Sequence, residues 1–406
     1  MNIKLKNCRV CSSEKINIFH TLKKMPLGDK YSVKKNLYNQ LLEINILKCE
    51  ECNHIQTSTI PDRTKIYSNY LSRPAAINKN LAGQYLKYAN DLKGYIKKDD
   101  LIIDIGSNDG AFLNFFKSNG YKNIVGVEPA KNLANQANKN KILTYNTFFN
   151  EAVCVKIQNK FQRKAKIILN NHSLSNVHDI NEILFNVKSM LAKKGIYSIQ
   201  TFYTIDVYNK NLLENFNHEH LNLFTVSSID KLAKRHGLEV IKAFHIDAKG
   251  GSIRTYISHI GDYKVDKNVE KFFNKENKFL KSKIPSKKIK KFINNNSKEI
   301  ISYIKKNNLK KIVGYGTSIG ATTFITQYNL EKKINFLIDD DPYRQNLYSP
   351  GTNILTTDKK IIDKFKPDLV IVLAPLYFDN IFSNLKKLDH NFSVIKIWPK
   401  LKILKV

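Results

Sequence analysis

The stretch from Asp100 to Leu113, DLIIDIGSNDGAFL, carries the strongest fold signal in this 406-residue chain. Its apolar run, residues 101–105, is typical of a buried parallel strand. A glycine-containing turn follows at residues 106–110, and an apolar helix begins at Ala111. In open α/β sheets small molecules bind outside the carboxyl ends of the strands and against helix N-termini, because free N–H groups there need acceptors. The stretch therefore predicts a ligand site in an α/β domain.

The spacing of the glycines in this turn indicates which ligand binds. A dinucleotide site needs glycines at positions i, i+2 and i+5, whereas here they stand at Gly106 and Gly110, so the spacing argues against NAD. The next apolar strand, residues 124–127, ends at Glu128, whose carboxylate can accept hydrogen bonds from both hydroxyls of a ribose. A strand, an Asp104-x-Gly106 turn, a helix and a second strand ending in glutamate resemble class I S-adenosylmethionine-dependent methyltransferases. The alternative is an ordinary strand-to-helix turn.

The composition indicates a globular protein of two or three domains. No apolar run of about 18 residues occurs and the first residues lack the apolar core of a signal peptide, so we expect a cytoplasmic protein with no membrane partner. With 67 Lys and Arg against 35 Asp and Glu, the net charge is +32. The lysines are spread along the whole chain without interleaved stacking aromatics, which argues against a nucleic-acid partner. The charge would still attract small anionic substrates.

Two Cys-x-x-Cys motifs lie near the N-terminus, formed by Cys8 with Cys11 and by Cys49 with Cys52. Four thiolates in this spacing can surround zinc tetrahedrally, and four sulfur ligands leave no open position for water, so we expect a structural metal. The residues between the motifs are predicted to form a small β-rich insert. A pair of disulfides is the alternative, which the missing secretion signal argues against. His54 is expected to be a surface or packing residue.

Polar residues that suit proton transfer follow two later strands. The turn after the strand at residues 167–169 contains Asn171, His172 and Asn176, and in this architecture it faces the transferring methyl group. Residues 217–220 read NHEH, and two histidines at i and i+2 cannot share one helix face as a zinc-protease motif requires. A histidine beside a carboxylate suits a general base near neutral pH, and a solvated or capping cluster is the alternative.

Residues 249–254, KGGSIR, lead into a further strand. Its two glycines let backbone approach a ligand closely, and Arg254 could pair with a phosphate or a carbonyl group. Residues from about 262 to 310 are rich in lysine and are predicted to form long solvated helices that bridge two domains.

The last segment alternates strands with helical stretches, which predicts a second parallel α/β domain. Its loop contains Gly314, Gly316 and Gly320, follows a strand and opens a helix, and Asp339 stands at the end of the next strand. The loop lacks the full dinucleotide spacing, so we expect a nucleotide contact there, with NAD as an alternative.

The cysteine motifs, the IGSNDGAFL corner, the HEH island, GGSIR and the IVGYG to DDDPYRQNLYSPGT segment occur in one order. That order resembles, over essentially the full length, the sugar C-methyltransferases, which methylate a carbon next to the ketone of a nucleotide-linked 4-keto deoxysugar. The resemblance implies an α/β fold with a zinc-binding domain at 1–65, a class I methyltransferase domain with a doubly wound sheet at 66–262, and a Rossmann-like substrate-binding domain at 263–406. It also implies S-adenosylmethionine and structural Zn²⁺ as cofactors, a nucleotide-linked sugar as partner, and a monomer or weak homo-oligomer.

The resemblance assigns roles to individual residues. His220 is the expected base, and Glu219 is expected to support its imidazolium. Tyr70 is expected to position the sugar or to hydrogen-bond the oxyanion that develops on it. The expected cofactor-binding residues are Asp104, Gly106, Ser107, Asn108, Gly110, Glu128, Pro129 and Asn171. The expected substrate-binding residues are His172, Asn176, Asn217, Arg254, Gly316 and Ser318. The expected metal ligands are Cys8, Cys11, Cys49 and Cys52.

The chain departs from the family pattern where the sugar is expected to lie. Arg73 replaces a serine, Asn217 replaces a tyrosine, and His172 and Asn176 stand in exchanged order. Methylation of a sugar oxygen or nitrogen is therefore the alternative within the class. An NAD-binding oxidoreductase and a zinc-knuckle nucleic-acid binder are alternatives from other classes.

Overall fold

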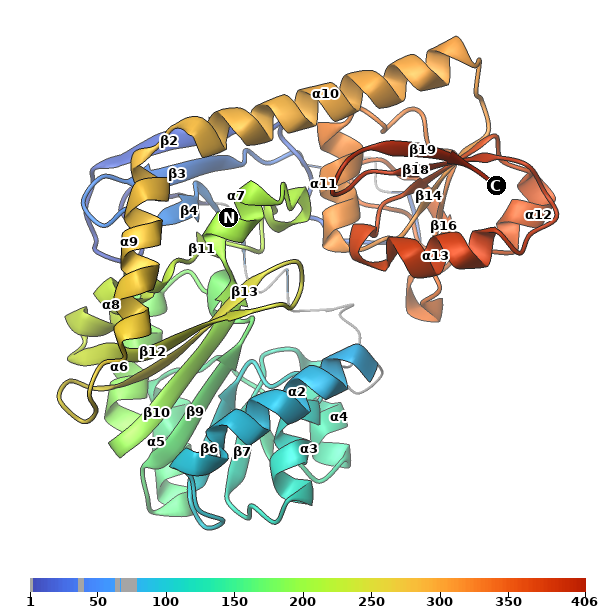
Figure 1. Ribbon diagram of the computed structural model, residues 1–406. Helices are drawn as coiled ribbons and strands as arrows, with labels where there is room; N and C mark the ends of the chain where they lie inside the picture. Colours follow the sequence, from blue (N-terminus) through green and yellow to red (C-terminus); the bar gives the residue numbers. More distant parts are fainter. Residues whose placement is uncertain (1–2, 36–39, 63–65, 67–78) are drawn as a thin grey trace.

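The computed structural model describes residues 3–35, 40–62, 66 and 79–406, so Tyr70 and Arg73 lie outside the described residues. The described chain contains a seven-stranded, a four-stranded and a six-stranded sheet and a two-stranded ribbon. Figure 1 shows the three larger sheets in separate lobes, with the long helix α10 (Ile284–Lys306) running from the N-terminal sheet to the C-terminal one. In this part of the chain no helix is both long and apolar enough to cross a membrane.

The central sheet has the expected class I methyltransferase fold. Its strand order is β12-β13-β10-β9-β6-β7-β8. The five strands from β8 to β10 are parallel, and β13 runs antiparallel to both of its neighbours. The strands are β6 (Leu101–Ile105), β7 (Ile124–Val127), β8 (Thr144–Tyr145), β9 (Ala165–Asn171), β10 (Leu191–Phe202), β12 (Leu238–Ile246) and β13 (Ser252–His259).

The central sheet is covered by helices on both faces because its strands are apolar on both faces. Successive side chains of a strand point to opposite sides, so Ile102 packs with α2 (Lys79–Leu92), α3 (Ala111–Ser118) and α4 (Lys131–Lys139). Its neighbour Ile103 packs with α5 (Glu151–Phe161), α6 (Ile180–Met190) and α8 (Val226–Arg235) on the other side. A sheet buried on both faces leaves its carboxyl edge as the place for a ligand.

The N-terminal sheet has the order β11-β4-β3-β2. Strands β2 (Ile16–Thr21) and β3 (Asn45–Cys49) pair antiparallel between the cysteine motifs, which confirms the β-rich insert. The edge strand β11 (Asn222–Leu223) comes from the segment that follows His220 and pairs with β4 (Ile55–Thr57). The region 1–65 therefore does not complete its own sheet. The short ribbon pairs β1 (Ile3–Lys4) with β5 (Thr59–Ile60).

The C-terminal sheet confirms the predicted second parallel α/β domain. Its order is β16-β15-β14-β17-β18-β19, and only β19 among these strands runs antiparallel to its neighbour. The strands are β14 (Ile312–Tyr315), β15 (Phe336–Ile338), β16 (Leu355–Thr357), β17 (Leu369–Val372), β18 (Ser393–Lys396) and β19 (Lys402–Lys405), and the helices are α11 (Ile319–Gln327), α12 (Ile361–Phe365) and α13 (Phe378–Leu385).

The predicted bridging helices are α9 (Lys267–Lys281) and α10. Near its start α10 is tied to the N-terminal sheet, because the Ser286 hydroxyl donates to the carbonyl oxygen of Phe19 at 2.6 Å. Near its end it is tied to the C-terminal sheet by Tyr303 and Ser393, whose hydroxyl oxygens lie 2.7 Å apart. The buried isoleucines of α10 join one apolar core with residues of both sheets. Helix α10 thus connects the N-terminal sheet to the C-terminal sheet and fixes their relative positions.

Candidate active site

The turn after β6 holds backbone conformations that few residues adopt. Gly106, Asn108 and Gly110 have φ values of +73°, +53° and +78°. A Cβ on Gly106 would lie 2.6 Å from the Cβ of Ser173, so only glycine fits there. Asparagine tolerates the left-handed region better than most residues, which suits position 108. The turn is therefore shaped for a close approach of its backbone to another group.

Glu128, at the end of β7, fixes this turn from the neighbouring strand. Its Oε2 accepts a hydrogen bond from the Asn108 N–H at 2.9 Å and its Oε1 accepts one from the Ala130 N–H at 2.8 Å. Burial raises the pKa of Glu128, and the two backbone bonds oppose that rise. Each carboxylate oxygen retains a second lone pair for a ligand hydroxyl. Pro129, which follows, accepts a hydrogen bond on its carbonyl oxygen from Asn146.

Buried polar atoms at the same edge need partners that the described residues do not supply. Asp104 Oδ1 and Asn171 Oδ1, at the ends of β6 and β9, and Ser107 Oγ are buried without a hydrogen bond in that part of the chain. Burial raises the pKa of Asp104 well above its usual range, and the charge of Glu128 adds to this. Such orphaned acceptors are rare in folded proteins unless a ligand satisfies them. The ammonium and hydroxyl donors of S-adenosylmethionine fit this set.

Tyr85, on α2, joins this site although the sequence did not point to it. Its ring stacks on Phe112 with centroids 4.6 Å apart, and its hydroxyl hydrogen-bonds with Asn171. Burial raises its pKa, and the charges of Asp104 and Asp109 add to the rise. The signal available in the sequence was the position of a tyrosine in the helix before the first strand. The tyrosine with an expected role, Tyr70, lies further upstream.

The ring of His220 is held in place through one of its two nitrogens. Its Nδ1 lies 3.0 Å from the carbonyl oxygen of Asn215 and 3.2 Å from Asn217 Nδ2. Because a carbonyl oxygen can only accept, Nδ1 carries the proton and Nε2 keeps a lone pair. Burial lowers the pKa of His220 to about 4, the bond to Asn215 opposes this, and the charge of Lys249 lowers it further. The imidazole is therefore neutral near pH 7, as a general base must be.

The ends of β9 and β10 bring His172 and His220 to the same place. Phe202, the last residue of β10, lies between them, with ring centroids 5.0 Å from His172 and 4.7 Å from His220. His172 has a φ of +57°, and neither of its ring nitrogens has a partner among the described residues. Burial lowers its pKa well below the usual range, and nearby positive charges add to this. Two of the predicted site residues thus lie on either side of one aromatic ring.

Glu219 does not support His220 in the way the sequence suggested. The His220 ring donates its Nδ1 proton to the carbonyl oxygen of Asn215, and the other polar atom beside Nδ1 is Asn217 Nδ2, at 3.2 Å. Burial raises the pKa of Glu219 to about 8, and the charge of Asp29 adds to this while Lys30 and Arg344 oppose it. The side chain therefore lies among groups of the N-terminal and C-terminal regions, and it is protonated near neutral pH.

Asn217 and His218 serve the turn that carries His220. Asn217 Oδ1 accepts hydrogen bonds from the N–H groups of Glu219 and His220 at 2.9 and 3.1 Å, and its Nδ2 donates to the Glu214 carbonyl oxygen at 3.0 Å. His218 Nε2 lies 3.2 Å from the carbonyl oxygen of Glu43. The expected substrate contact at Asn217 is therefore replaced by a role in shaping the turn.

Arg254 also differs from the expectation that it binds substrate. It is buried on β13, its Nε donates to Gln200 Oε1 at 2.9 Å, and its Nη1 donates to Asp91 Oδ2 at 2.7 Å. The guanidinium lies 3.4 Å above the centre of the Tyr88 ring. Since Asp91 and Tyr88 belong to α2, Arg254 anchors that helix on the sheet.

The C-terminal loop contacts the region of Glu219 through a buried ion pair. Arg344 Nη1 lies 2.7 Å from Asp29 Oδ1 and donates to the Thr317 carbonyl oxygen at 2.9 Å. Ser318 is exposed at the start of α11, and Gly316 has a φ of +108°. Asn176, which follows β9, accepts a hydrogen bond from the Ser175 hydroxyl at 3.0 Å.

Two residues that a NAD site in this loop would need, Asp339 and Gly320, are engaged by other parts of the protein. Asp339, at the position where a dinucleotide site holds a ribose, accepts hydrogen bonds from the N–H and the hydroxyl of Thr317. A Cβ on Gly320 would lie 2.5 Å from the Cβ of Glu214, so the start of α11 packs against the central domain. Gly320 is therefore explained by this close packing. In a dinucleotide site the same glycine would instead make room for a pyrophosphate at the helix N-terminus.

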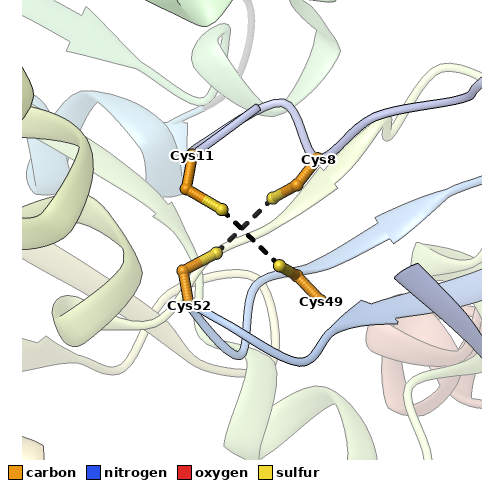
Figure 2. Close-up of side chains that lie close together, drawn as sticks. All are labelled: Cys8, Cys11, Cys49 and Cys52. Atoms are coloured by element: carbon orange, nitrogen blue, oxygen red, sulfur yellow. Dashed lines mark hydrogen bonds between the residues drawn. The ribbon is translucent and has the colours of Figure 1, made fainter. Parts of the chain in front are cut away.

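Cys8, Cys11, Cys49 and Cys52 converge in one cluster, and Figure 2 shows their sulfur atoms pointing toward a common centre from two loops. All four Sγ atoms lie within 4.8 Å of one another, and the cysteines are free. The Cys8 to Cys52 and Cys11 to Cys49 sulfur distances are 3.4 and 3.6 Å, too long for disulfides. A tetrahedral zinc with bonds of about 2.3 Å needs sulfurs roughly 3.8 Å apart, so the cluster fits a metal. His54 is buried and its Nε2 lies 3.1 Å from Asn222 Oδ1, which confirms a packing role.

Comparisons with known proteins agree with this geometry. Residues 77–243 match the family described as methyltransferase domain, and residues 247–395 match the family described as C-methyltransferase C-terminal domain. C-methyltransferase NovU of Streptomyces niveus is 24% identical over 359 residues, which cover 86% of this chain and 84% of that protein.

Among solved structures, the PH0226 protein of Pyrococcus horikoshii OT3 is 12% identical, with a TM-score of 0.38 over 48% of this chain and 98% of that one. An S-adenosylmethionine-dependent methyltransferase of Clostridium acetobutylicum is 12% identical, with a TM-score of 0.36 over 49% and 98% of the two chains. The strand order, the turn at Gly106 and the two family matches identify the chain as an S-adenosylmethionine-dependent methyltransferase that carries a C-methyltransferase C-terminal domain.

Proposed function

We propose that this enzyme methylates a carbon next to the ketone of a nucleotide-linked keto-deoxysugar. The observation that carries the proposal is the orientation of His220, whose Nδ1 is engaged by the Asn215 carbonyl oxygen while Nε2 keeps its lone pair. The similarity to a C-methyltransferase supports carbon as the acceptor atom. Methylation of a sugar oxygen or nitrogen is the alternative within the class.

In the proposed reaction His220 Nε2 takes the proton from the carbon next to the ketone. The electron pair of that C–H bond moves into the enolate, and the negative charge resides on the former ketone oxygen. S-adenosylmethionine supplies an electrophilic methyl group on a sulfonium. The enolate carbon forms a bond to that methyl, the S–CH₃ bond breaks toward sulfur, and the ketone is restored. Tyr70, outside the described residues, is proposed to position the sugar.

The cofactor is proposed to lie at the carboxyl edge of the central sheet. Gly106 and Gly110 would allow its methionine part to approach the backbone, and Glu128 would accept hydrogen bonds from its ribose hydroxyls. Asp104 and Asn171 each offer a buried acceptor that the described residues leave open. The adjacent His172 and His220 would then face the methyl group.

The nucleotide part of the substrate is proposed to lie near Glu219 and the C-terminal loop. The charges of Lys30 and Arg344 act on Glu219, and Arg344 is bonded to Thr317 of that loop. A protonated Glu219 could donate a hydrogen bond to a substrate oxygen. The cysteine cluster is proposed to hold structural Zn²⁺, because four thiolates leave no open coordination position.

The test is incubation with S-adenosylmethionine and a panel of nucleotide-linked keto sugars, read by mass spectrometry for the gain of one CH₂. A second arm incubates enzyme and sugar in deuterated water without S-adenosylmethionine. Carbon methylation requires exchange of the C–H next to the ketone, whereas methylation of oxygen or nitrogen does not. Methylated product that has lost one solvent-exchangeable hydroxyl or amine proton, without enzyme-dependent C–H exchange, would contradict carbon as the acceptor.

A further inference from the structure

Lys249 lies beside the two histidines of the site and has no role so far. Its Nζ lies 5.8 Å from the centre of the Phe202 ring, the ring that separates His172 from His220. Its positive charge also lowers the pKa of both histidines, which places the ammonium close to each of them. The side chain therefore comes from the loop between β12 and β13 to the ends of β9 and β10, where the reaction is proposed to occur.

The backbone of this loop holds Lys249 in an uncommon conformation. Lys249 has a φ of +50°, and the next residues, Gly250 and Gly251, have φ values of +83° and +143°. The loop is closed by a hydrogen bond from the Gly251 N–H to the Ala248 carbonyl oxygen at 2.9 Å, and Lys210 Nζ donates to the Gly250 carbonyl oxygen at 2.8 Å. A lysine in the left-handed region costs energy that the surrounding contacts must offset, and such positions concentrate at functional sites.

The charges around Lys249 leave its ammonium without a described counter-ion. Besides Lys249, the charges that act on His172 are those of His220 and of Arg254 from β13, and the charge that acts on His220 is that of Lys249 itself. None of these groups is an anion. Lys249 forms no ion pair with a described carboxylate. Although the residue is exposed to water, surrounding protein lowers its pKa to about 8. An amine in such a place is suited to pair with an anion that arrives or forms beside it.

We propose that Lys249 stabilises the oxyanion that forms on the substrate when His220 removes the proton next to the ketone. This inference rests on the proposed function. The ammonium donates a hydrogen bond to the enolate oxygen and keeps its own proton, while the substrate proton stays on His220 Nε2. When the enolate carbon takes the methyl group, the charge leaves the oxygen and the hydrogen bond weakens. Because the interaction is strongest when the negative charge is present, it favours the transition state over the bound ketone.

The experiment compares Lys249→Met, Lys249→Arg and the control Lys242→Met, which removes a lysine from the neighbouring β12. Each variant is assayed for C–H exchange in deuterated water without S-adenosylmethionine, for methyl transfer, and for S-adenosylmethionine affinity by calorimetry. Lys249→Met is expected to slow both exchange and methyl transfer by about 100-fold or more, as loss of an oxyanion donor does, with KM and cofactor affinity within about threefold of wild type. Lys249→Arg keeps the charge and is expected to retain most of the exchange rate.

The pH dependence of kcat/KM gives a second test, because a purely structural role of Lys249 would leave that dependence unchanged. The ammonium is present below its pKa of about 8 and is lost above it, so kcat/KM of the wild type falls on the alkaline side. Arginine stays charged at those pH values, so this fall moves to higher pH in Lys249→Arg.

Three results would overturn the inference while the proposed function stands. The first is exchange by Lys249→Met within about threefold of wild type, and the second is a rise in KM alone, which would indicate a binding contact. The third is covalent trapping of the ketone on Lys249 by borohydride, which would indicate an imine instead of a hydrogen-bonded enolate. If the wild type neither exchanges nor methylates any keto sugar, the proposed function fails and the inference fails with it.

Discussion

Nη1 of Arg9 donates a hydrogen bond to the carbonyl oxygen of Leu221 at 3.0 Å, and Leu221 directly follows His220. The same nitrogen donates to the Thr57 carbonyl oxygen, also at 3.0 Å. Arg9 stands between Cys8 and Cys11, so the cysteine cluster is bonded to the segment that carries the proposed base. The cysteine cluster and the turn that carries the proposed base therefore depend on one another.

Removal of the metal is expected to weaken the fold and turnover more than cofactor binding. Cys11→Ser, or treatment with a strong chelator, is expected to lower the free energy of unfolding by about 3 kcal/mol or more, because structural metals contribute directly to folding. The proposed S-adenosylmethionine site lies on the central sheet, so the affinity for this cofactor is expected to change little. Urea unfolding and calorimetry measure the two quantities. Cys154→Ala, which removes a thiol outside the cluster, is the control, and an equal loss of turnover in that variant would contradict the prediction.

Gly106→Ala is expected to weaken binding of S-adenosylmethionine by at least about tenfold. The new Cβ would lie 2.6 Å from Ser173 at a φ of +73°, so the turn must shift. A side chain in the left-handed region costs roughly 1–2 kcal/mol, which corresponds to about a tenfold change in affinity. Gly94→Ala is the control, since a Cβ there meets no atom within 4 Å. Equal affinities of the two variants in a calorimetric titration would show that the turn does not bind the cofactor.

His220→Gln is expected to lower kcat by about 10²–10⁴-fold while S-adenosylmethionine affinity is kept. Burial lowers the pKa of this histidine to about 4, so the neutral base is present at all pH values above that. The acid side of the kcat/KM profile of the wild type is therefore expected to stay flat well below the ordinary histidine pKa of about 6.5. His390→Gln, in the C-terminal domain, should leave turnover unchanged. An acid limb near pH 6.5 would point to another base.

Glu219→Gln is expected to change how stability depends on pH. The pKa of Glu219 is about 8 in the folded protein, above its usual value near 4.5, because the side chain is buried and lies near Asp29. Between these two values the folded state holds a proton that the unfolded state releases, so this residue makes stability fall as pH rises through that window. Glutamine mimics the protonated form and removes this fall.

Urea titrations from pH 5 to about 9 measure the effect. The variant should gain stability relative to wild type as pH rises, and the two should converge at the acidic end. Glu299→Gln, an exposed position on α10, is the control, and it should run parallel to wild type. A constant difference between Glu219→Gln and wild type at every pH would contradict the raised pKa.

The strand, turn and helix at the proposed cofactor site could be predicted from sequence because these parts are local. The strand, the Gly106 turn and Glu128 lie within a stretch of about 30 residues, and their periodicity and spacing are typical of one supersecondary unit. The cysteine cluster was also predictable, because each Cys-x-x-Cys motif is local and its spacing is typical of a pair of metal ligands.

The acceptor half could be predicted only in part because its contacts join distant segments. Arg254 pairs with Asp91, 163 residues earlier, and no pattern in the sequence indicates that pair. Glu219 was assigned to its sequence neighbour His220, but the structure turns the side chain toward Asp29 and Arg344. The glycines after Lys249 stand out in the sequence but the lysine does not, because its position beside Phe202 depends on how β13 pairs with β10.

The edge strand β11 ties the segment with His220 to the N-terminal sheet, whereas the proposed cofactor site has no such tie among the described residues. The proposed cofactor site belongs to one continuous stretch of the central sheet, whereas the turn with His220 runs directly into a strand that completes another sheet. Substitutions in the N-terminal region are therefore expected to move His220 and the proposed acceptor site more than they move the proposed cofactor site.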